Sequence, residues 1–173
     1  MKPILVGEIG INASGSLDTA IKLIDMAYDS GLRYIKFQKR EPDLSTPDSH
    51  KQILRETPWG IIPYIEYKHK IEFGKQEYDI INDHCNTWGM KWTSSVWDLP
   101  SLDFMNQYDV PFLKIPSAKI TDIPLLEASR DFCLRKNVPI IVSTGMSTED
   151  EILECLSYFV SDLPLTYVLA CTS

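Results

Sequence analysis

The fold is decided near the amino terminus by the stretch Leu5–Gln38, which reads LVGEIGINASGSLDTAIKLIDMAYDSGLRYIKFQ. It begins and ends with apolar runs, and between them apolar residues recur at helical spacing. Ser16 stands where a helix N-cap is expected, and Gly31 is a stop signal at the far end. The stretch therefore predicts a strand over residues 4–11, a helix, and a second strand over Tyr34–Gln38.

The same alternation continues to the end of the chain. Further strands are expected at residues 91–97, 112–116, 139–143 and 166–171. Helices are expected at residues 71–88, 100–107 and 124–136, and again from Ser147, with Asp150 as its capping-box partner. The remaining segment, residues 39–65, is polar and contains four prolines. Strands that alternate with helices in this way predict an α/β fold with a parallel sheet.

Such a sheet is either an open doubly wound sheet or a TIM barrel, and the polar residues favour the barrel. All six expected strands carry polar residues at or near their carboxyl ends, namely Glu8, Lys36, Gln38, Ser95, Lys114, Ser117, Ser143, Thr144, Thr172 and Ser173. The carboxyl ends of all strands meet at one face of a barrel, whereas an open sheet gathers polar residues only at a switch point. The first turn, GINASG, also departs from the GxGxxG pattern of dinucleotide-binding folds.

Six strands are too few to close a barrel that needs eight. We therefore expect an incomplete TIM (β/α)8-type barrel that spans residues 1–173, with open edges at its first and last strands. The missing strands are expected either from a truncated remainder of the chain or from another polypeptide.

Composition excludes several classes of function. The chain has a net charge of −7 and no long basic run, which argues against nucleic-acid binding. It has no stretch of membrane-spanning length and no signal peptide, so a cytoplasmic protein is expected. Four widely spaced cysteines suit reduced, buried thiols rather than disulfides or a zinc site. The three histidines, His50, His69 and His84, do not stand at metal-ligand spacing.

The residues at the strand ends indicate an anion site. Lys36 and Lys114 both lie inside apolar strand segments, and two such lysines at matching places favour a phosphate or carboxylate ligand. Each serine or threonine alone reads as a turn or cap residue, but together with the lysines they are typical of a cradle for an oxyanion. Glu8 is then the candidate acid/base or substrate-orienting group.

Six motifs together resemble the sialic acid synthase (N-acetylneuraminate synthase) family. They are EIGIN followed by SGS within residues 8–16, IKFQ at 35–38, TSSVW at 93–97, LKIPSA at 113–118, VSTGMS at 142–147 and ACTS at 170–173. The resemblance implies a transferase of carbohydrate biosynthesis that condenses phosphoenolpyruvate (PEP) with an N-acetylmannosamine-type sugar, giving a nonulosonic acid and phosphate. It also implies a TIM-barrel catalytic domain, usually followed by an antifreeze-like domain that this sequence lacks.

The resemblance further implies roles for individual residues. Glu8 corresponds to a glutamate near the reacting carbonyl of the sugar, and the substrate-binding residues are Lys36, Gln38, Ser95, Lys114, Ser117, Ser143, Thr144, Thr172 and Ser173. The family uses a divalent metal, Mn²⁺ or Mg²⁺, whose histidine ligands lie on strands beyond the end of this chain. No metal ligand is therefore expected here, and the 173 residues alone are expected to have little or no synthase activity.

Two departures from the family pattern leave the acceptor sugar open. Ala13 and Ser14 stand where the family has His-Asn, and Lys119 stands where a sugar-binding glutamate falls. One alternative is therefore another PEP-condensing synthase of the 3-deoxy-sugar-acid type. Another is a non-catalytic remnant that binds a ligand or a partner subunit. The expected assembly is a homodimer or a complex with a complementing fragment.

Overall fold

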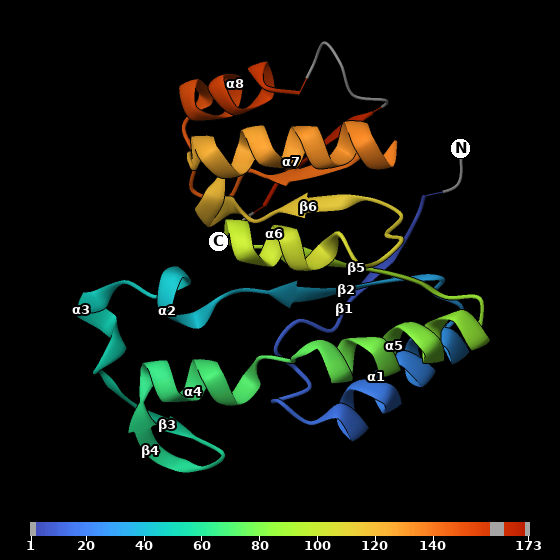
Figure 1. Cartoon of the computed structure of the whole chain (residues 1–173), viewed down its shortest axis with the longest axis vertical. Coiled ribbons are helices and arrows are strands. Elements are labelled where there is room, and N and C mark those ends of the chain that lie inside the picture. Colours follow the sequence, from blue (N-terminus) through green and yellow to red (C-terminus); the bar gives the residue numbers. More distant parts are fainter. Residues whose placement is uncertain (1–2, 160–164, 172–173) are drawn as a thin grey trace. The chain divides into compact units, whose positions relative to one another are not determined.

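The computed structural model describes residues 3–159 and 165–171 (Figure 1). The chain forms two compact units, which divide in sequence between Trp92 and Thr93. In both units the strands of the main sheet run parallel to their paired neighbours and alternate with helices, which confirms the predicted α/β class.

The first unit is built on two parallel strands, β1 (Val6–Glu8) and β2 (Tyr34–Lys39). Helix α1 (Leu17–Asp29) joins them, and the Ser16 hydroxyl caps it by accepting a hydrogen bond from the Thr19 N–H, as predicted. β1 is much shorter than the strand expected over residues 4–11. It ends early because the chain turns at Gly10, whose φ is +45°.

One face of β2 belongs to the core of this unit. Ile35 and Phe37 are buried, and the Phe37 ring contacts Tyr78 and Trp92 with ring centroids 6.0 and 6.3 Å apart. Tyr78 comes from α5 (Lys75–Thr87), which lies beside α1 (Figure 1). Because side chains alternate along a strand, Lys36 and Gln38 lie on the opposite face of β2.

The polar segment after β2 is folded into four short elements. They are α2 (Pro42–Ser45), α3 (Asp48–Lys51) and an antiparallel hairpin of β3 (Leu54–Thr57) and β4 (Gly60–Pro63). Helix α4 (Tyr64–Ile71) follows directly. The helix expected from residue 71 in fact begins at Lys75. The break arises because Glu72 and Gly74 are in extended conformation and the Gly74 N–H bonds to the Glu77 carboxylate, which begins α5 as a new helix.

The loop between β1 and α1 packs closely on the end of α4. Ala13 is buried, and Gly15 has a φ of +73°. A Cβ atom at Gly15 would overlap the carbonyl oxygen of Lys70 and lie 3.2 Å from the Cα of Ile71. The approach of backbone to backbone therefore requires glycine at this position.

The second unit carries four parallel strands in chain order. They are β5 (Lys91–Val96), whose first two residues belong to the first unit, β6 (Leu113–Ile115), β7 (Ile140–Ser143) and β8 (Thr166–Leu169). The connecting helices are α6 (Leu99–Met105), the short 3₁₀ turn η1 (Ser117–Lys119), α7 (Ile123–Lys136) and α8 (Glu149–Ser157). β6 alternates clearly: Leu113 and Ile115 are fully buried, while Lys114 between them lies on the other face.

Two predictions for this unit were wrong in detail. The N-cap of α8 is Thr148 with Glu151 as its capping-box partner, not Ser147 with Asp150. The shift arises because the Ser147 N–H bonds to the Thr144 carbonyl and Met146 has a φ of +61°, so Ser147 belongs to the preceding turn. The expected strand over residues 166–171 also ends at Leu169, which leaves Cys171 exposed rather than buried.

Candidate active site

In the first unit, the sequence candidates come together at the end of β1 and β2. Glu8 and Lys36 are directly opposite in the parallel register, and their side chains form an ion pair. The Lys36 side chain is 12% exposed and the Glu8 side chain 47% exposed, so the pair is open to solvent on the carboxylate side. Lys36 also donates to the Phe37 carbonyl at 3.3 Å, and Gln38 follows on the same face.

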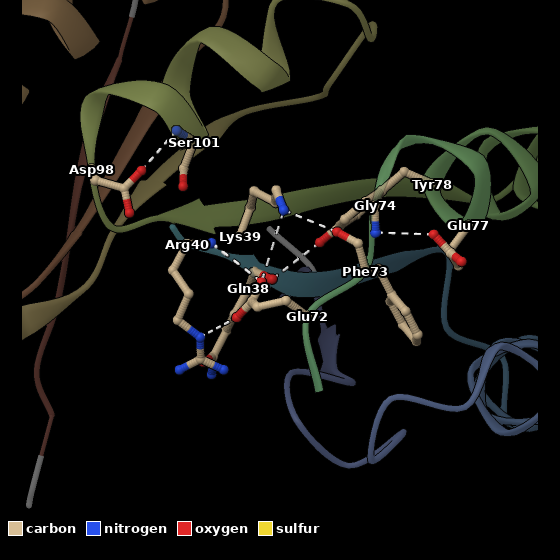
Figure 2. Close-up of polar contacts among 10 residues, drawn as sticks. All are labelled: Gln38, Lys39, Arg40, Glu72, Phe73, Gly74, Glu77, Tyr78, Asp98 and Ser101. Atoms are coloured by element: carbon tan, nitrogen blue, oxygen red, sulfur yellow. Dashed lines mark hydrogen bonds and ion pairs between the residues drawn. The ribbon is translucent and has the colours of Figure 1, made fainter. Parts of the chain in front are cut away.

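A buried polar network fixes the carboxyl end of β2, and no sequence pattern predicted it. Figure 2 shows the Arg40 guanidinium and the Lys39 ammonium directed at the Glu72 carboxylate. Arg40 is only 4% exposed. Lys39 donates to the Phe73 carbonyl at 2.9 Å, and the Tyr78 hydroxyl donates to the Gln38 carbonyl at 3.0 Å. These bonds join β2 to the connection between α4 and α5.

The charge state of Glu72 reflects two opposing effects. Burial raises the pKa of the Glu72 carboxyl above its ordinary value, and the nearby Arg40 and Lys39 only partly offset this. The buried Glu72 carboxylate therefore depends on Arg40 and Lys39 to stabilise its charge. Arg40 and Glu72 are 32 residues apart, so no local spacing pattern could have paired them.

In the second unit, two of the candidates, Lys114 and Ser117, line a pocket of about 510 Å³ at the carboxyl ends of β6 and β7. Its lining includes Lys114, Ser117, Gly145, Met146, Ser147 and Trp97. The Ser117 hydroxyl accepts a hydrogen bond from the Gly145 N–H at 3.1 Å, which ties η1 to the turn after β7. Ser95 pairs in register with Lys114, so both lie on the face away from Leu113 and Ile115.

The remaining candidates differ in their surroundings. Ser143 is buried at the end of β7. The Thr144 hydroxyl donates to the Leu169 carbonyl at 3.0 Å, so it also joins β7 to β8. Thr172 and Ser173 lie outside the described residues.

Cys171 is a feature of this end of the sheet that the sequence did not indicate. A hydrogen bond with the Ser143 side chain lowers the pKa of its thiol, with further contributions from Lys114 and from the Thr144 and Gly145 backbone. Burial has the opposite effect on the other three cysteines. It raises the pKa of Cys85 and Cys133 to about 12 and that of Cys155 to about 11.

The four thiols should therefore differ sharply in reactivity. A thiolate, not a thiol, attacks alkylating reagents, so we expect iodoacetamide at neutral pH to label Cys171 first. The buried thiols should react only after unfolding in urea. Peptide mass spectrometry over a time course measures this, and comparable early labelling of Cys85 would contradict the structure.

The three histidines lie in helices. His84 in α5 contacts Asp25 at 2.7 Å, His69 in α4 contacts Asp43 at 3.1 Å, and His50 lies in α3. Within residues 3–159 and 165–171, no three His, Cys, Asp or Glu side chains are arranged to hold a metal ion. These residues do not fit the divalent metal expected for the family, and we assign it no ligand among them. In the same ranges, no helix is long and apolar enough to cross a membrane.

The fold and the polar pocket at its strand ends define an α/β protein of the TIM-barrel type. A solved sialic acid synthetase from Leptospira borgpetersenii, crystallised with citrate, superposes with a TM-score of 0.83. It is 26% identical, and the match covers 99% of this chain and 55% of that one. A truncated 3-deoxy-D-arabino-heptulosonate 7-phosphate synthase from Thermotoga maritima, 12% identical with a TM-score of 0.61, shares the fold alone.

Sequence comparison gives the family. The NeuB family pattern matches residues 23–173, and the chain belongs to this family of sialic-acid-synthase-type enzymes. An N-acetylneuraminate-9-phosphate synthase from Drosophila melanogaster is 34% identical over 146 residues, which are 83% of this chain and 38% of the relative. An N,N'-diacetyllegionaminic acid synthase from Campylobacter jejuni is 31% identical over 158 residues, 90% of this chain and 46% of the relative. The chain thus spans less than half the length of these relatives.

Proposed function

We propose that this chain carries the PEP-binding part of a synthase that condenses PEP with an N-acetylmannosamine-type sugar. The products are a sialic or other nonulosonic acid and inorganic phosphate. The observation that carries the proposal is the pocket that contains Lys114, Ser117 and the turn at residues 145–147. An ammonium group and hydroxyls are donors that bind phosphate and carboxylate, the two anionic groups of PEP.

In this proposal the residues bind and orient the reactants. Lys114 neutralises PEP, and Ser95, Ser117 and Ser143 supply hydroxyl donors. Lys36 and Gln38 bind the substrate at the end of β2, and Glu8 orients the reacting carbonyl of the sugar. Carbon C3 of PEP attacks that carbonyl, water then adds at C2, and phosphate leaves with cleavage of its C–O bond. Holding the reactants together is the contribution of this chain to the rate.

The proposal includes the setting of the reaction. It places the protein in the cytoplasm, as a homodimer or with a complementing fragment. Residues 1–173 are then part of a barrel domain. The antifreeze-like domain and the ligands of the divalent metal, Mn²⁺ or Mg²⁺, are expected outside the residues described.

A different acceptor is favoured by one observation. Lys119 lies between two residues that line the pocket, Ala118 and Ile120, and pairs with Asp122 at 3.1 Å. A cation beside the pocket changes which hydroxyl or anionic groups an acceptor sugar can present there. Another PEP-condensing synthase of the 3-deoxy-sugar-acid type is therefore the second candidate.

Titration calorimetry with PEP tests the proposal. We expect the chain to bind PEP and Lys114→Ala to weaken binding roughly 10- to 100-fold, the loss of one or two charge-assisted hydrogen bonds. Lys91→Ala removes an exposed lysine on β5 and is the matched control, with affinity unchanged. Wild-type chain that does not bind PEP, or equal affinities in all three proteins, would refute the proposal.

A turnover assay separates the functional alternatives. The assay contains PEP, Mn²⁺ and N-acetylmannosamine. If product forms only when a complementing fragment is added, the chain is part of a synthase. Turnover with a different aldose supports the second candidate. Binding of PEP without turnover under any complementation supports a ligand-binding remnant and overturns the proposed synthase.

A further inference from the structure

Gly10 lies directly beyond β1, at the point where the chain leaves the strand. Its N–H donates to the Lys36 carbonyl at 3.3 Å, and the N–H of Ile9 donates to the same oxygen at 2.9 Å. Its φ of +45° lies in the left-handed region. The backbone at Gly10 is therefore held against the strand that carries Lys36.

The space beside Gly10 is filled by two candidate site residues. A Cβ atom built on Gly10 would lie 2.5 Å from Oε1 of Glu8 and 3.1 Å from Nε2 of Gln38. The first separation is shorter than van der Waals contact permits, so the carboxylate and a side chain at residue 10 cannot occupy their places together.

The outcome of such a clash is decided by which atom can move. Glu8 meets residue 10 with the end of a flexible side chain that is 47% exposed. A larger residue 10 would therefore push the carboxylate into solvent rather than disrupt the core. Moving it would break its ion pair with Lys36.

We infer that Gly10 is a positioning residue: the absence of a side chain at residue 10 allows the Glu8 carboxylate to reach Lys36 beside the Gln38 amide. The role of these three residues in substrate binding rests on the proposed function. Lys36 thus has an anion of the protein itself, the Glu8 carboxylate, as its partner, and Gly10 keeps that carboxylate in place.

A double-mutant cycle tests the geometry without any ligand. Gly10→Ala should lower the folding equilibrium constant by the strain of a left-handed alanine, roughly 5- to 30-fold, and further by displacement of Glu8. In the Glu8→Ala background the second contribution is absent, so the loss should be smaller by about threefold or more. Gly31→Ala is the matched control, because Gly31 also has a positive φ, of +86°, but nothing within 4 Å of its Cβ position. Gly31→Ala should lower the folding equilibrium constant by the same factor in the wild-type and Glu8→Ala backgrounds. If Gly10→Ala also lowers it by the same factor in both backgrounds, the inference is overturned.

Anion binding supplies a readout that a purely structural glycine would not change. Gly10→Ala and Glu8→Gln both remove the carboxylate from Lys36, so both should bind PEP about two- to fivefold more tightly than wild type, the scale of a partly exposed ion pair. Gly31→Ala should bind as wild type does. Tighter binding by Glu8→Gln alone would overturn the inference. If no variant binds PEP, the proposed function fails, and the stability cycle still decides the role of Gly10.

Discussion

Replacement of Arg40 with methionine is expected to lower the free energy of unfolding at pH 7 by about 3–5 kcal/mol. Methionine has a similar length and no charge, so the change leaves Glu72 buried without its main cation. Removing one partner of a buried ion pair costs much more than the pair itself contributes, since the remaining charge has lost water as well as its partner. Urea unfolding followed by circular dichroism measures the loss.

The pH dependence of this variant identifies the cause. Burial already raises the pKa of Glu72 in the folded chain, and loss of Arg40 removes the largest effect that lowers it. A carboxyl whose pKa is raised on folding binds protons more tightly in the folded chain than in the unfolded chain. Its contribution to stability therefore falls as the pH rises above the ordinary pKa of the carboxyl. Arg40→Met should therefore lose least stability at acidic pH, where the Glu72 carboxyl is protonated, and most at neutral pH.

Arg130 provides the matched control. It also pairs with a carboxylate, that of Asp131 at 3.1 Å, but its side chain is 35% exposed and that of Asp131 is 62% exposed. Arg130→Met should change the free energy of unfolding by no more than about 1 kcal/mol, without the same pH trend. Equal losses for Arg40→Met and Arg130→Met would show that the network in Figure 2 does not stabilise the first unit.

Gly15→Ala is expected to destabilise the chain by about 2–5 kcal/mol. Part of the loss is the strain of alanine at a φ of +73°, and part is the overlap of its Cβ with the Lys70 carbonyl oxygen. That oxygen belongs to the backbone of α4, so it cannot rotate away as a side chain can. Thermal unfolding measures the change.

Gly89→Ala separates the two contributions. Gly89 has a φ of +62° but nothing within 4 Å of its Cβ position, so alanine there should cost only the backbone strain of about 1–2 kcal/mol. A loss for Gly15→Ala no larger than that for Gly89→Ala would mean that the loop between β1 and α1 is not held against α4 in solution.

The order of strands and helices could be predicted because it is a local property of the sequence. Ser16 caps α1 through a residue three positions on, and the apolar alternation around Lys114 predicts which face its side chain takes. The break before α5 was missed, because the apolar residues Ile71 and Phe73 continue a helical pattern across a segment that is extended.

The candidate residues were predicted for the same reason, and their partners were not. Strand ends can be located from the sequence, so the sequence predicts Glu8 and Lys36 as candidates but does not predict their ion pair. Arg40 and Glu72 are far apart along the chain, and their pairing depends on how α4 and α5 follow β2. The positive φ of Met146 could not be predicted, because methionine, unlike glycine, rarely adopts this conformation.

The β3–β4 hairpin has a consequence for how proteins of this fold diverge. Among the described residues its strands pair with each other alone, from Leu54 opposite Pro63 to Thr57 opposite Gly60. An insertion or deletion at its tip would therefore leave the parallel pairing of β1 with β2 unaltered. We therefore expect changes in loop length to be tolerated at this tip, whereas an insertion within a buried strand would shift its register.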